Sequence, residues 1–435
     1  MVLRKRRGYT VATNVCRWVL ALVLIVSGFV KAVDPVGSMY KLQEYVEVFS
    51  LGAFSDEFLM LAAMLQAALE FLLGISLLMG IYRKFVTWFT PLVMLFFTVL
   101  TFVIYRGDMV ADCGCFGDAV TLSNGETFAK NVLLLLLSLV VFLGRRRLVY
   151  YISSKSRWMV TIFAIFYIAF AGILSLSHLP VVDFSPYTVG GDLRALTEGV
   201  PGEYSVVDVY GRDSMQLEVA DGELPDSSWT YIESRPVLVK EPVLPVISDF
   251  AILDWEADLD VVPELLADSG YVCVVVIEDV GRASVSSVDK INELYDYCLD
   301  TDVPLIAATA SEDDAIELWR KRTGAEYPVL WTEEAVARKM IRANPGLVLI
   351  KDGVIAGKWN VADLPAVEVY SASATGMPDG VDTLLGYVQG WRFWILLLVL
   401  PLLFIVVVDA LACRNDGKEG DGKQQPGNDT ETENI

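Results

Sequence analysis

The chain has 435 residues, of which 54% are hydrophobic, and its mean hydropathy is +0.47. Soluble proteins of this length rarely reach such values, and the composition is typical of a membrane protein. The formal net charge of -21 argues against nucleic acid as a partner, because nucleic acids bind basic surfaces.

Six apolar segments are long enough to cross a bilayer as helices, for which roughly 17–25 residues suffice. They are residues 16–33, 58–80, 86–105, 130–144, 158–177 and 391–411. The fourth is short unless it begins near Thr127. The first follows a basic stretch, as in a signal peptide, but no small-residue cleavage site comes after it, so we expect a retained helix.

The basic residues beside these segments predict their orientation. Arginine and lysine residues precede the first segment, separate the second from the third and the fourth from the fifth, and follow the sixth. Because such flanks stay in the cytoplasm, we expect both termini to be cytoplasmic. The loops 34–57 and 106–129 and the domain 178–390 then lie outside. This pattern predicts a multi-pass protein of the bacterial cytoplasmic (inner) membrane with a periplasmic domain.

Seven parts follow one another along the chain. Residues 1–150 are expected to form a membrane domain of four helices, because only helices or closed barrels satisfy the backbone in lipid. The others are the fifth membrane helix (151–180), a small β-rich segment (181–246), an α/β domain (247–365), a connector (366–390), the sixth membrane helix (391–412) and a polar tail (413–435). We expect the tail to be disordered.

The acidity belongs to the part outside the membrane. Residues 178–390 hold 38 acidic and 14 basic side chains, a net charge of -24. Strand-like runs predict a hairpin at 204–220. Further on, strands are expected at 271–277, 303–309, 327–331, 347–350 and 354–359, and helices at 287–299, 311–324 and 332–343, the last two capped by Ser311 and Thr332. This alternation predicts an α/β layer fold with parallel strands.

The sequence Asp112-Cys113-Gly114-Cys115-Phe116-Gly117-Asp118 follows the third apolar segment, in a loop where thiols tend to be oxidised. A disulfide between Cys113 and Cys115 would close a small, strained ring. Strain makes a disulfide more oxidising and more labile, which suits a pair that passes electrons and does not suit a structural cross-link. The two aspartates act against this role, because negative charge disfavours the thiolate.

Other interpretations of the cysteines stay open. Cys113 and Cys115 are a redox pair, a vestigial or structural pair, or two ligands of a soft metal, although no histidine lies near them and we assign no metal site. Cys273 and Cys298 are expected to be buried as small apolar residues, with a bond between them as the alternative.

Ionisable residues lie within the apolar segments, and Glu70 and Lys31 are the two that matter most here. Glu70 is near the middle of the second segment, with Gln66 one turn earlier on the same face. Lys31 is near the outer end of the first, where its side chain could reach the interface. Because a carboxylate in lipid is costly, Glu70 is either a functional group that faces a partner or cavity, or a packing contact that is protonated or bonded to a neighbouring helix.

Residues 10–150 resemble the DoxX/MauE family. The resemblance is carried by SGFVKAVDP at 27–35, by Glu70 followed by Gly74, and by CGCFG at 113–117. It implies a four-helix membrane protein associated with redox chemistry, with Cys113 and Cys115 as the redox pair and Lys31 and Glu70 as framework positions. MauE members are implicated in the maturation of methylamine dehydrogenase. The bundle is compared with vitamin K epoxide reductase, which implies a quinone as cofactor by analogy.

Residues 247–360 resemble thioredoxin-like domains of the peroxiredoxin/TlpA type, through ISDFAILDWEADLD, YVCVVVI and NPGLVLIKDGVI. In that fold a proline, usually cis, precedes a strand that ends in a K-(D/N)-G hairpin, and Pro345 occupies that place. The catalytic cysteines should follow the strand 271–277, but residues 278–284 contain none. The resemblance therefore implies a domain that does not exchange disulfides itself and whose groove at Asn344 and Pro345 holds an extended peptide.

These features together predict a membrane redox-associated protein, a thiol–disulfide oxidoreductase or maturation factor that acts on a periplasmic protein or thiol client. Cys113 and Cys115 would accept electrons from the client, and the α/β domain would recruit it. Two other classes remain. One is a non-enzymatic assembly scaffold that docks partners on its acidic domain. The other, weaker for want of an evident inverted repeat, is a small-solute transporter built around Glu70.

Overall fold

The computed structural model describes residues 2–107, 109–110, 114, 117–120, 122–199, 202–212, 215–220, 228–242, 245–247, 250–255, 257–371, 376–378 and 390–421. The chain forms two compact units, which are described separately. The membrane unit comprises residues Met1–Phe184 and Val381–Ile435, and the sheet unit comprises residues Ser185–Gly380.

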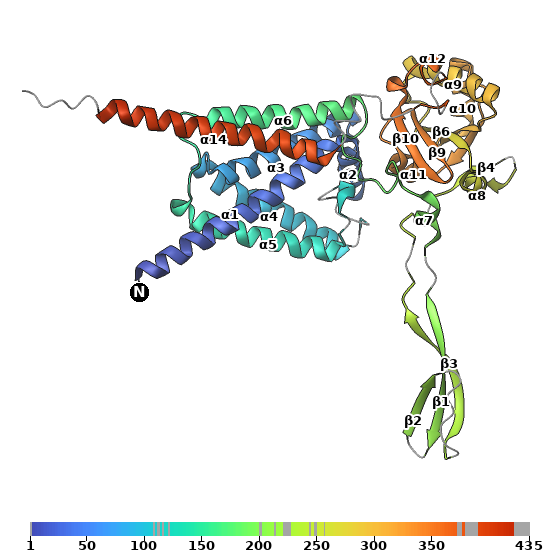
Figure 1. Cartoon of the computed structure of the whole chain (residues 1–435), viewed down its shortest axis with the longest axis horizontal. Coiled ribbons are helices and arrows are strands. Elements are labelled where there is room, and N and C mark those ends of the chain that lie inside the picture. Colours follow the sequence, from blue (N-terminus) through green and yellow to red (C-terminus); the bar gives the residue numbers. More distant parts are fainter. Residues whose placement is uncertain are drawn as a thin grey trace, which may run out of the picture. The chain divides into compact units, whose positions relative to one another are not determined.

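The membrane unit is a bundle of long helices (Figure 1). They are α1 (Val2–Val33), α2 (Pro35–Val48), α3 (Asp56–Met79), α4 (Arg83–Gly107), α5 (Asn124–Leu143), α6 (Arg157–Ser177) and α14 (Trp391–Asp421), with single 3-10 turns η1 (Gly117–Ala119) and η2 (Arg145–Arg147). Within the described part of the chain, six helices are long and apolar enough to cross a membrane, all but α2. The six predicted segments are therefore confirmed, and the chain is a multi-pass membrane protein.

Helix α5 begins earlier than its apolar run, at Asn124, because a capping box fixes its start. The Ser123 hydroxyl accepts a hydrogen bond from the Glu126 amide, and the Glu126 carboxylate accepts one from the Ser123 amide. This arrangement satisfies two amides that no carbonyl of the helix can reach. The fourth membrane helix thus reaches the length that its apolar residues alone did not give.

Helix α2 is a correction to the predicted loop at 34–57. Its start carries two local signals: Pro35 occupies the first turn, and the Asp34 carboxylate accepts a hydrogen bond from the Gly37 amide. Proline and an acidic cap both favour a helix start. The segment is not apolar enough to be noticed as a membrane helix, yet it adds a polar helix directly after α1.

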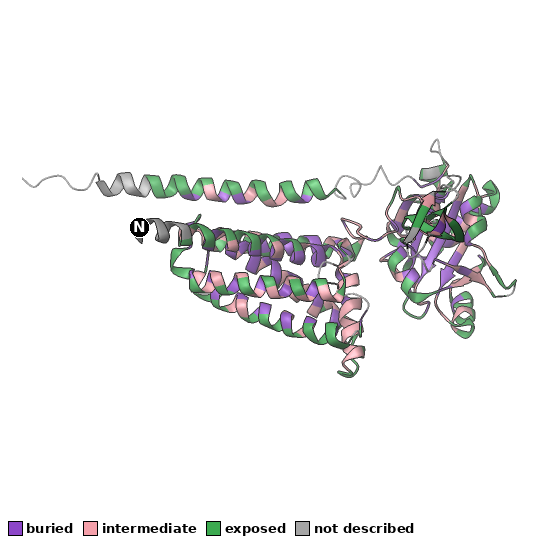
Figure 2. Ribbon diagram, turned by 90° about the horizontal axis from the view of Figure 1, so that it is seen from below, coloured by how far each residue is buried: buried purple, intermediate pink, exposed green. Residues whose placement is uncertain are grey.

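Helices α1 and α3 cross at very short distance, because each has a glycine at the crossing. A Cβ atom at Gly28 would lie 2.5 Å from the amide nitrogen of Phe71, and one at Gly74 would lie 2.7 Å from the amide nitrogen of Ile25. Small residues at such crossings let helix backbones meet in lipid. The outward faces of the bundle carry exposed apolar side chains, as a lipid contact requires (Figure 2).

Helix α14 joins the same unit through polar contacts at both ends. The Tyr167 hydroxyl donates a hydrogen bond of 2.9 Å to the Trp394 carbonyl. The Asp409 carboxylate accepts hydrogen bonds from the hydroxyls of Ser153 and Ser156, each 2.5 Å long. The helix continues to Asp421, and the predicted disorder of the tail stays a prediction. Residues 422–435 lie outside the described part.

The sheet unit contains a seven-stranded sheet of order β10-β9-β6-β7-β8-β4-β5. Its strands are β4 (Ile252–Asp254), β5 (Leu259–Asp260), β6 (Tyr271–Ile277), β7 (Leu305–Thr309), β8 (Val329–Thr332), β9 (Gly346–Lys351) and β10 (Val354–Asn360). β6, β7 and β8 run parallel, whereas β9, β10, β4 and β5 pair antiparallel with their neighbours. The sheet is mixed, and the prediction of parallel strands holds only for its centre.

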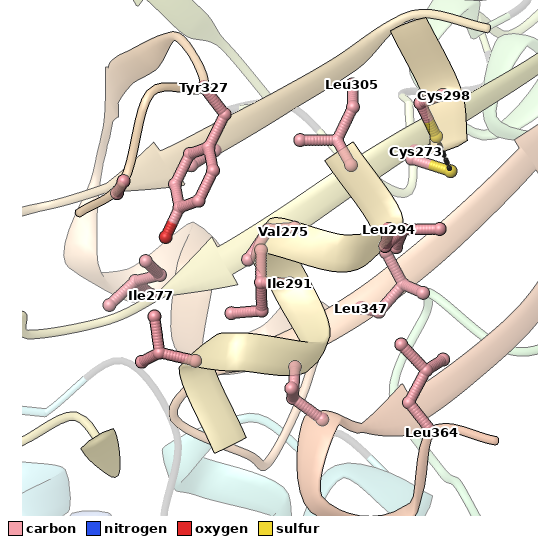
Figure 3. Packing of buried hydrophobic residues seen from close by; sticks show 14 of the residues in the cluster. Cys273, Val275, Ile277, Ile291, Leu294, Cys298, Leu305, Tyr327, Leu347 and Leu364 are labelled. Carbon is pink, nitrogen blue, oxygen red and sulfur yellow. Dashed lines mark hydrogen bonds between the residues drawn. The ribbon is translucent and has the colours of Figure 1, made fainter. Parts of the chain in front are cut away.

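The helices of this sheet are α8 (Val262–Ala267), α9 (Val288–Thr301), α10 (Asp313–Thr323), α11 (Glu334–Met340) and α12 (Val367–Ser371), with 3-10 turns η3 (Val285–Ser287) and η4 (Val361–Asp363). Every residue of β6 after Tyr271 is buried. Such a run of branched apolar residues is typical of a central strand covered on both faces. The main core lies between this strand, β7, β9 and helix α9 (Figure 3).

Both predicted helix caps in this unit were wrong. Helix α10 is preceded by Glu312 and helix α11 by Glu333, each one residue after the expected position. The Ser311 hydroxyl instead accepts a hydrogen bond of 3.0 Å from the Val280 amide. The Thr332 hydroxyl donates one of 2.8 Å to the Ala251 carbonyl, which joins the end of β8 to the segment before β4. Tertiary contacts have replaced the local ones.

A second, three-stranded sheet has the order β2-β1-β3, with β1 (Glu203–Arg212), β2 (Met215–Ala220) and β3 (Thr230–Lys240) all antiparallel. It confirms the predicted hairpin and adds a strand that was not expected. All residues of β3 are exposed. The short helix α7 (Leu193–Glu198) precedes this sheet. It contacts the seven-stranded sheet at the turn between β9 and β10, where the Leu193 amide donates a hydrogen bond to the Gly353 carbonyl.

Candidate functional site

A buried ion pair joins α1 to α3 in the apolar part of the bundle. The Lys31 ammonium lies 2.7 Å from Oε2 and 2.8 Å from Oε1 of Glu70. Both side chains are buried, at 8% and 3% exposure for the whole residues. We expected the Lys31 side chain to reach the interface, but the side chain is buried inside the bundle. It faces a carboxylate that would be costly in lipid without a counter-charge.

Two further residues complete the hydrogen bonds of Glu70. The Ser27 hydroxyl donates to Oε2 over 2.7 Å, and the Gln66 amide donates to Oε1 over 3.3 Å. Ser27 is one helical turn before Lys31, and Gln66 is one turn before Glu70, so each helix presents two polar groups on one face. Glu70 was expected to bond to a neighbouring helix as one alternative, and it does so through Lys31 of α1. The cluster brings together Lys31, Gln66 and Glu70.

The ion pair lines a cavity of about 70 Å³. Among the described lining residues, its polar wall holds three lysines, Lys31, Lys41 and Lys130, and one carboxylate, Glu70. The other polar lining residues are Ser27, Ser38, Tyr45, Gln66 and Asn131, and the apolar wall includes Val23, Leu24, Leu42, Ala63, Met94, Phe97, Leu100 and Leu134. The described lining thus carries more lysines than carboxylates, although Lys31 is paired with Glu70.

The cavity also reaches the loop between α4 and α5, because Gly114 lines it. Gly114 has a φ of +57°, and a Cβ atom there would lie 2.8 Å from Cγ of Lys41. Its carbonyl accepts a hydrogen bond of 3.0 Å from the Gly117 amide. Cys113 and Cys115 lie outside the described residues, so the predicted redox pair stays a prediction. Gly114, the residue between the two cysteines, lies against the side chain of Lys41.

Lys41 and Lys130 were not among the predicted site residues. Lys41 lies on α2, which the sequence did not predict as a helix, and Lys130 lies in the first turns of α5, before the apolar run. Lys41 pairs with Glu44 at 3.1 Å. Asn131, next to Lys130, donates to the Thr101 hydroxyl over 3.2 Å and so ties α5 to α4. A count of lysines at the outer ends of the helices would have been the only signal in the sequence.

The predicted groove at Asn344 and Pro345 lies beside the segment that follows β6. The Asn344 amide donates a hydrogen bond of 2.8 Å to the Asp279 carbonyl, and the Ser284 amide donates one of 3.1 Å to the Asn344 carbonyl. The peptide bond between Asn344 and Pro345 is cis. Within the residues described, Oδ1 of Asn344 is buried without a hydrogen-bond partner. Asn344 is thus in contact with Asp279 and Ser284, and the peptide-binding groove stays a prediction.

A quinone is larger than the cavity that the described residues form in the membrane unit. An engineered apolar cavity of roughly 150 Å³ holds benzene, and a quinone ring is larger than benzene, whereas this cavity measures about 70 Å³. Its size suits a few water molecules beside the lysines. We therefore derive no step through a quinone.

Metal ligands do not gather anywhere in the described ranges: no group of three or more His, Cys, Asp or Glu side chains could hold an ion there. The single histidine, His178, lies directly after the last turn of α6.

Comparison with known proteins identifies one region. Residues 9–144, which include most of α1 and all of α2 to α5, match the family model described as methylamine utilisation protein MauE. No curated protein matches the chain. The match covers the ion pair, the three lysines of the cavity and the loop that contains Gly114.

Proposed function

We propose that this protein is a membrane thiol–disulfide exchange protein that matures proteins of the bacterial envelope through Cys113 and Cys115. The observation that supports this most is the place of Gly114. The residue between the two cysteines lines a cavity with three lysines in its wall. The resemblance to MauE, whose members are implicated in maturing an enzyme rich in disulfides, agrees with such a role.

The charge around the cavity favours the reactive form of a thiol. The thiolate is the nucleophile in disulfide exchange, and neighbouring cations stabilise it. Lys41 packs against Gly114, and Lys31 and Lys130 line the same cavity. Their positive charge opposes that of Asp112 and Asp118, which flank the cysteines in the sequence.

The exchange conserves atoms and electrons without a further cofactor. One thiolate of the reduced pair attacks a disulfide sulfur of the client and forms a mixed disulfide, while the client's other sulfur leaves as a thiolate. The second cysteine then attacks the mixed disulfide and releases the client as a dithiol. In the reverse direction the oxidised pair takes two electrons from two thiols of a client and leaves a new disulfide in it.

The second part of the proposal gives the sheet unit a thioredoxin-like fold and the task of binding the client. The order of β10, β9, β6 and β7 supports it, with β6 and β7 parallel and β9 and β10 forming a hairpin against β6. Residues 278–284 contain no cysteine, so binding without catalysis is the role that fits. The client would lie in the groove at Asn344 and Pro345, on the periplasmic side.

Trapping of mixed disulfides tests the exchange. Cys113→Ser and Cys115→Ser each leave one cysteine of the pair, so a client adduct formed by the remaining thiol cannot be resolved. We expect reductant-sensitive adducts with at least one single variant and none with the double variant, measured on non-reducing gels from native membranes. Cys16→Ser is the control and should leave the adducts unchanged.

Gly114→Ala tests the supporting observation separately. The added Cβ atom would meet Lys41 and would adopt a left-handed backbone at a cost of about 1 kcal/mol, so we expect slower alkylation of the cysteine pair. Gly52→Ala is the matched control, because Gly52 also has a positive φ but has no heavy atom within 4 Å of its added Cβ. If Gly114→Ala and Gly52→Ala have equal alkylation rates, the contact between Gly114 and Lys41 does not affect the reactivity of the cysteine pair.

A scaffold is the second candidate, because strand β3 is exposed along its entire length. Exposed strands with apolar side chains offer a surface for partner binding. The same cysteine variants distinguish the two functions. If the double variant matures the envelope proteins as well as the native chain does, the exchange proposal is wrong and the scaffold remains.

A further inference from the structure

The core of the sheet unit contains two thiols in direct contact. Cys273 lies in β6 and Cys298 lies near the end of α9, and their Sγ atoms are 3.9 Å apart (Figure 3). The exposed fractions of the two residues are 0% and 1%. They belong to different elements, 25 positions apart in the chain, so their contact is a product of the fold and not of sequence neighbourhood.

We propose that Cys273 and Cys298 form a disulfide that links β6 to α9 when the protein folds outside the cytoplasm. Two sulfur atoms at 3.9 Å are in van der Waals contact, and a disulfide requires them to approach to about 2 Å. This proposal does not rest on Cys113 or Cys115. It rests on the predicted location of the sheet unit in an oxidising compartment.

Oxidation of this pair occurs before the core has closed. The hydrogen bond with Cys298 and burial together raise the pKa of the Cys273 thiol, and the buried sulfur atoms are out of reach of a second protein in the folded unit. The oxidant is therefore a protein disulfide that meets the chain while it folds. One thiolate attacks that disulfide, the other resolves the mixed disulfide, and the two electrons leave with the oxidant, which is released as a dithiol.

The link would hold the strand that positions the proposed groove. β6 is a central strand between β9 and β7, and the chain leaves it into the residues that contact Asn344. A disulfide across about 25 residues restricts the unfolded chain and so favours the folded one. It would make this unit more stable and leave the groove itself free of thiols.

Thiol counting tests the proposal directly. In a variant with Cys16, Cys113, Cys115 and Cys413 replaced by serine, Cys273 and Cys298 are the remaining cysteines. The full chain is quenched with acid in its native membrane, denatured, and treated with a mass-shifting maleimide. We expect no label before reduction and two labels after it. Two labels before reduction would overturn the proposal, whatever the outcome for Cys113 and Cys115.

Thermal unfolding of the purified full chain gives a second measurement. Reductant should lower the melting temperature of the sheet unit by several degrees when both cysteines are present, and it should have no effect on Cys298→Ala. An equal response of the two proteins to reductant would contradict the link. Labelling does not require Cys298→Ala to fold, so the proposal stays testable if that variant is unstable.

Discussion

At the scale of single residues, the pair of Lys31 and Glu70 explains how a chain can keep two charges in apolar helices. Glu70 accepts hydrogen bonds from Lys31, Ser27 and Gln66, so its carboxylate has partners on both oxygens. A buried charge is tolerated when it is paired and hydrogen-bonded. Each partner depends on the other, which makes the loss of one worse than the loss of both.

We predict that Glu70→Gln lowers the free energy of unfolding by about 3–5 kcal/mol, because Lys31 stays buried without a counter-charge. Lys31→Met should have a similar effect. The double variant should recover most of the loss, since it leaves no unpaired charge at this contact between α1 and α3. Denaturant titration of the detergent-solubilised protein, followed by tryptophan fluorescence, measures all three.

Glu44→Gln is the control for these variants, because Glu44 forms a lysine ion pair in the same unit but at a partly exposed position. Such a pair contributes about 0–1 kcal/mol. If Glu44→Gln destabilises the bundle as much as Glu70→Gln does, or if the double variant loses the sum of both single losses, burial of the pair is not the cause.

The sequence singled out Lys31, Gln66 and Glu70 but did not pair Lys31 with Glu70. The apolar surroundings of Glu70 required a partner for it, and the spacing of Gln66 placed that residue on the same face. The identity of the partner could not be predicted, because it depends on how deep α1 and α3 lie relative to each other. That depth is fixed by Gly28 and Gly74, whose contacts involve backbone atoms of the facing helix.

At the scale of elements, the crossing of α1 and α3 depends on the absence of side chains. We predict that Gly28→Ala destabilises the bundle by about 1–3 kcal/mol, as overpacking generally does. The new Cβ atom would meet the backbone of Phe71 and Ala67, which cannot rotate away. The measurement is again the free energy of unfolding in detergent.

Gly125→Ala, in α5, is the matched control. Its added Cβ atom would lie 3.4 Å from the Tyr105 ring, which is ordinary contact, and alanine favours helices over glycine by about 1 kcal/mol. We expect unchanged or slightly higher stability. If Gly125→Ala lowers the free energy of unfolding as much as Gly28→Ala does, close packing at the crossing of α1 and α3 is not the cause of the loss.

Elements were predicted well where apolar residues decide them and poorly where polar residues do. The membrane helices follow from hydropathy, and β6 follows from its run of branched residues. Helix α2 and the start of α5 depend on capping groups, Asp34 and Ser123, which hydropathy ignores. Ser311 and Thr332 were expected to cap helices by the same local rule, yet their hydroxyls bond to Val280 and Ala251, distant in sequence.

At the scale of the whole molecule, the distribution of charge sets the topology. Acidic residues concentrate in 178–390, and basic residues flank the membrane helices. Because an even number of crossings returns the chain to its starting side, both termini share one side when all six helices cross. The basic flanks predict that this side is the cytoplasm, and we then expect the sheet unit to lie outside.

Labelling of intact cells with a membrane-impermeant maleimide tests this orientation, in a background without the other cysteines. A cysteine at Glu317→Cys, on the exposed face of α10, should be labelled at once. Cys413, exposed near the end of α14, should be labelled only after the cells are opened. Labelling of Cys413 in intact cells, with protection at position 317, would reverse the topology.

The ion pair also has a consequence for how the protein is made. Ribosomes release α1 first, and a lysine that is buried in a membrane bundle without its counter-charge is costly. Lys31 meets its carboxylate only when α3 has emerged, after α2. We therefore expect α1 to stay at the insertion machinery until α3 arrives, so that the two helices enter the lipid together as a neutral hairpin.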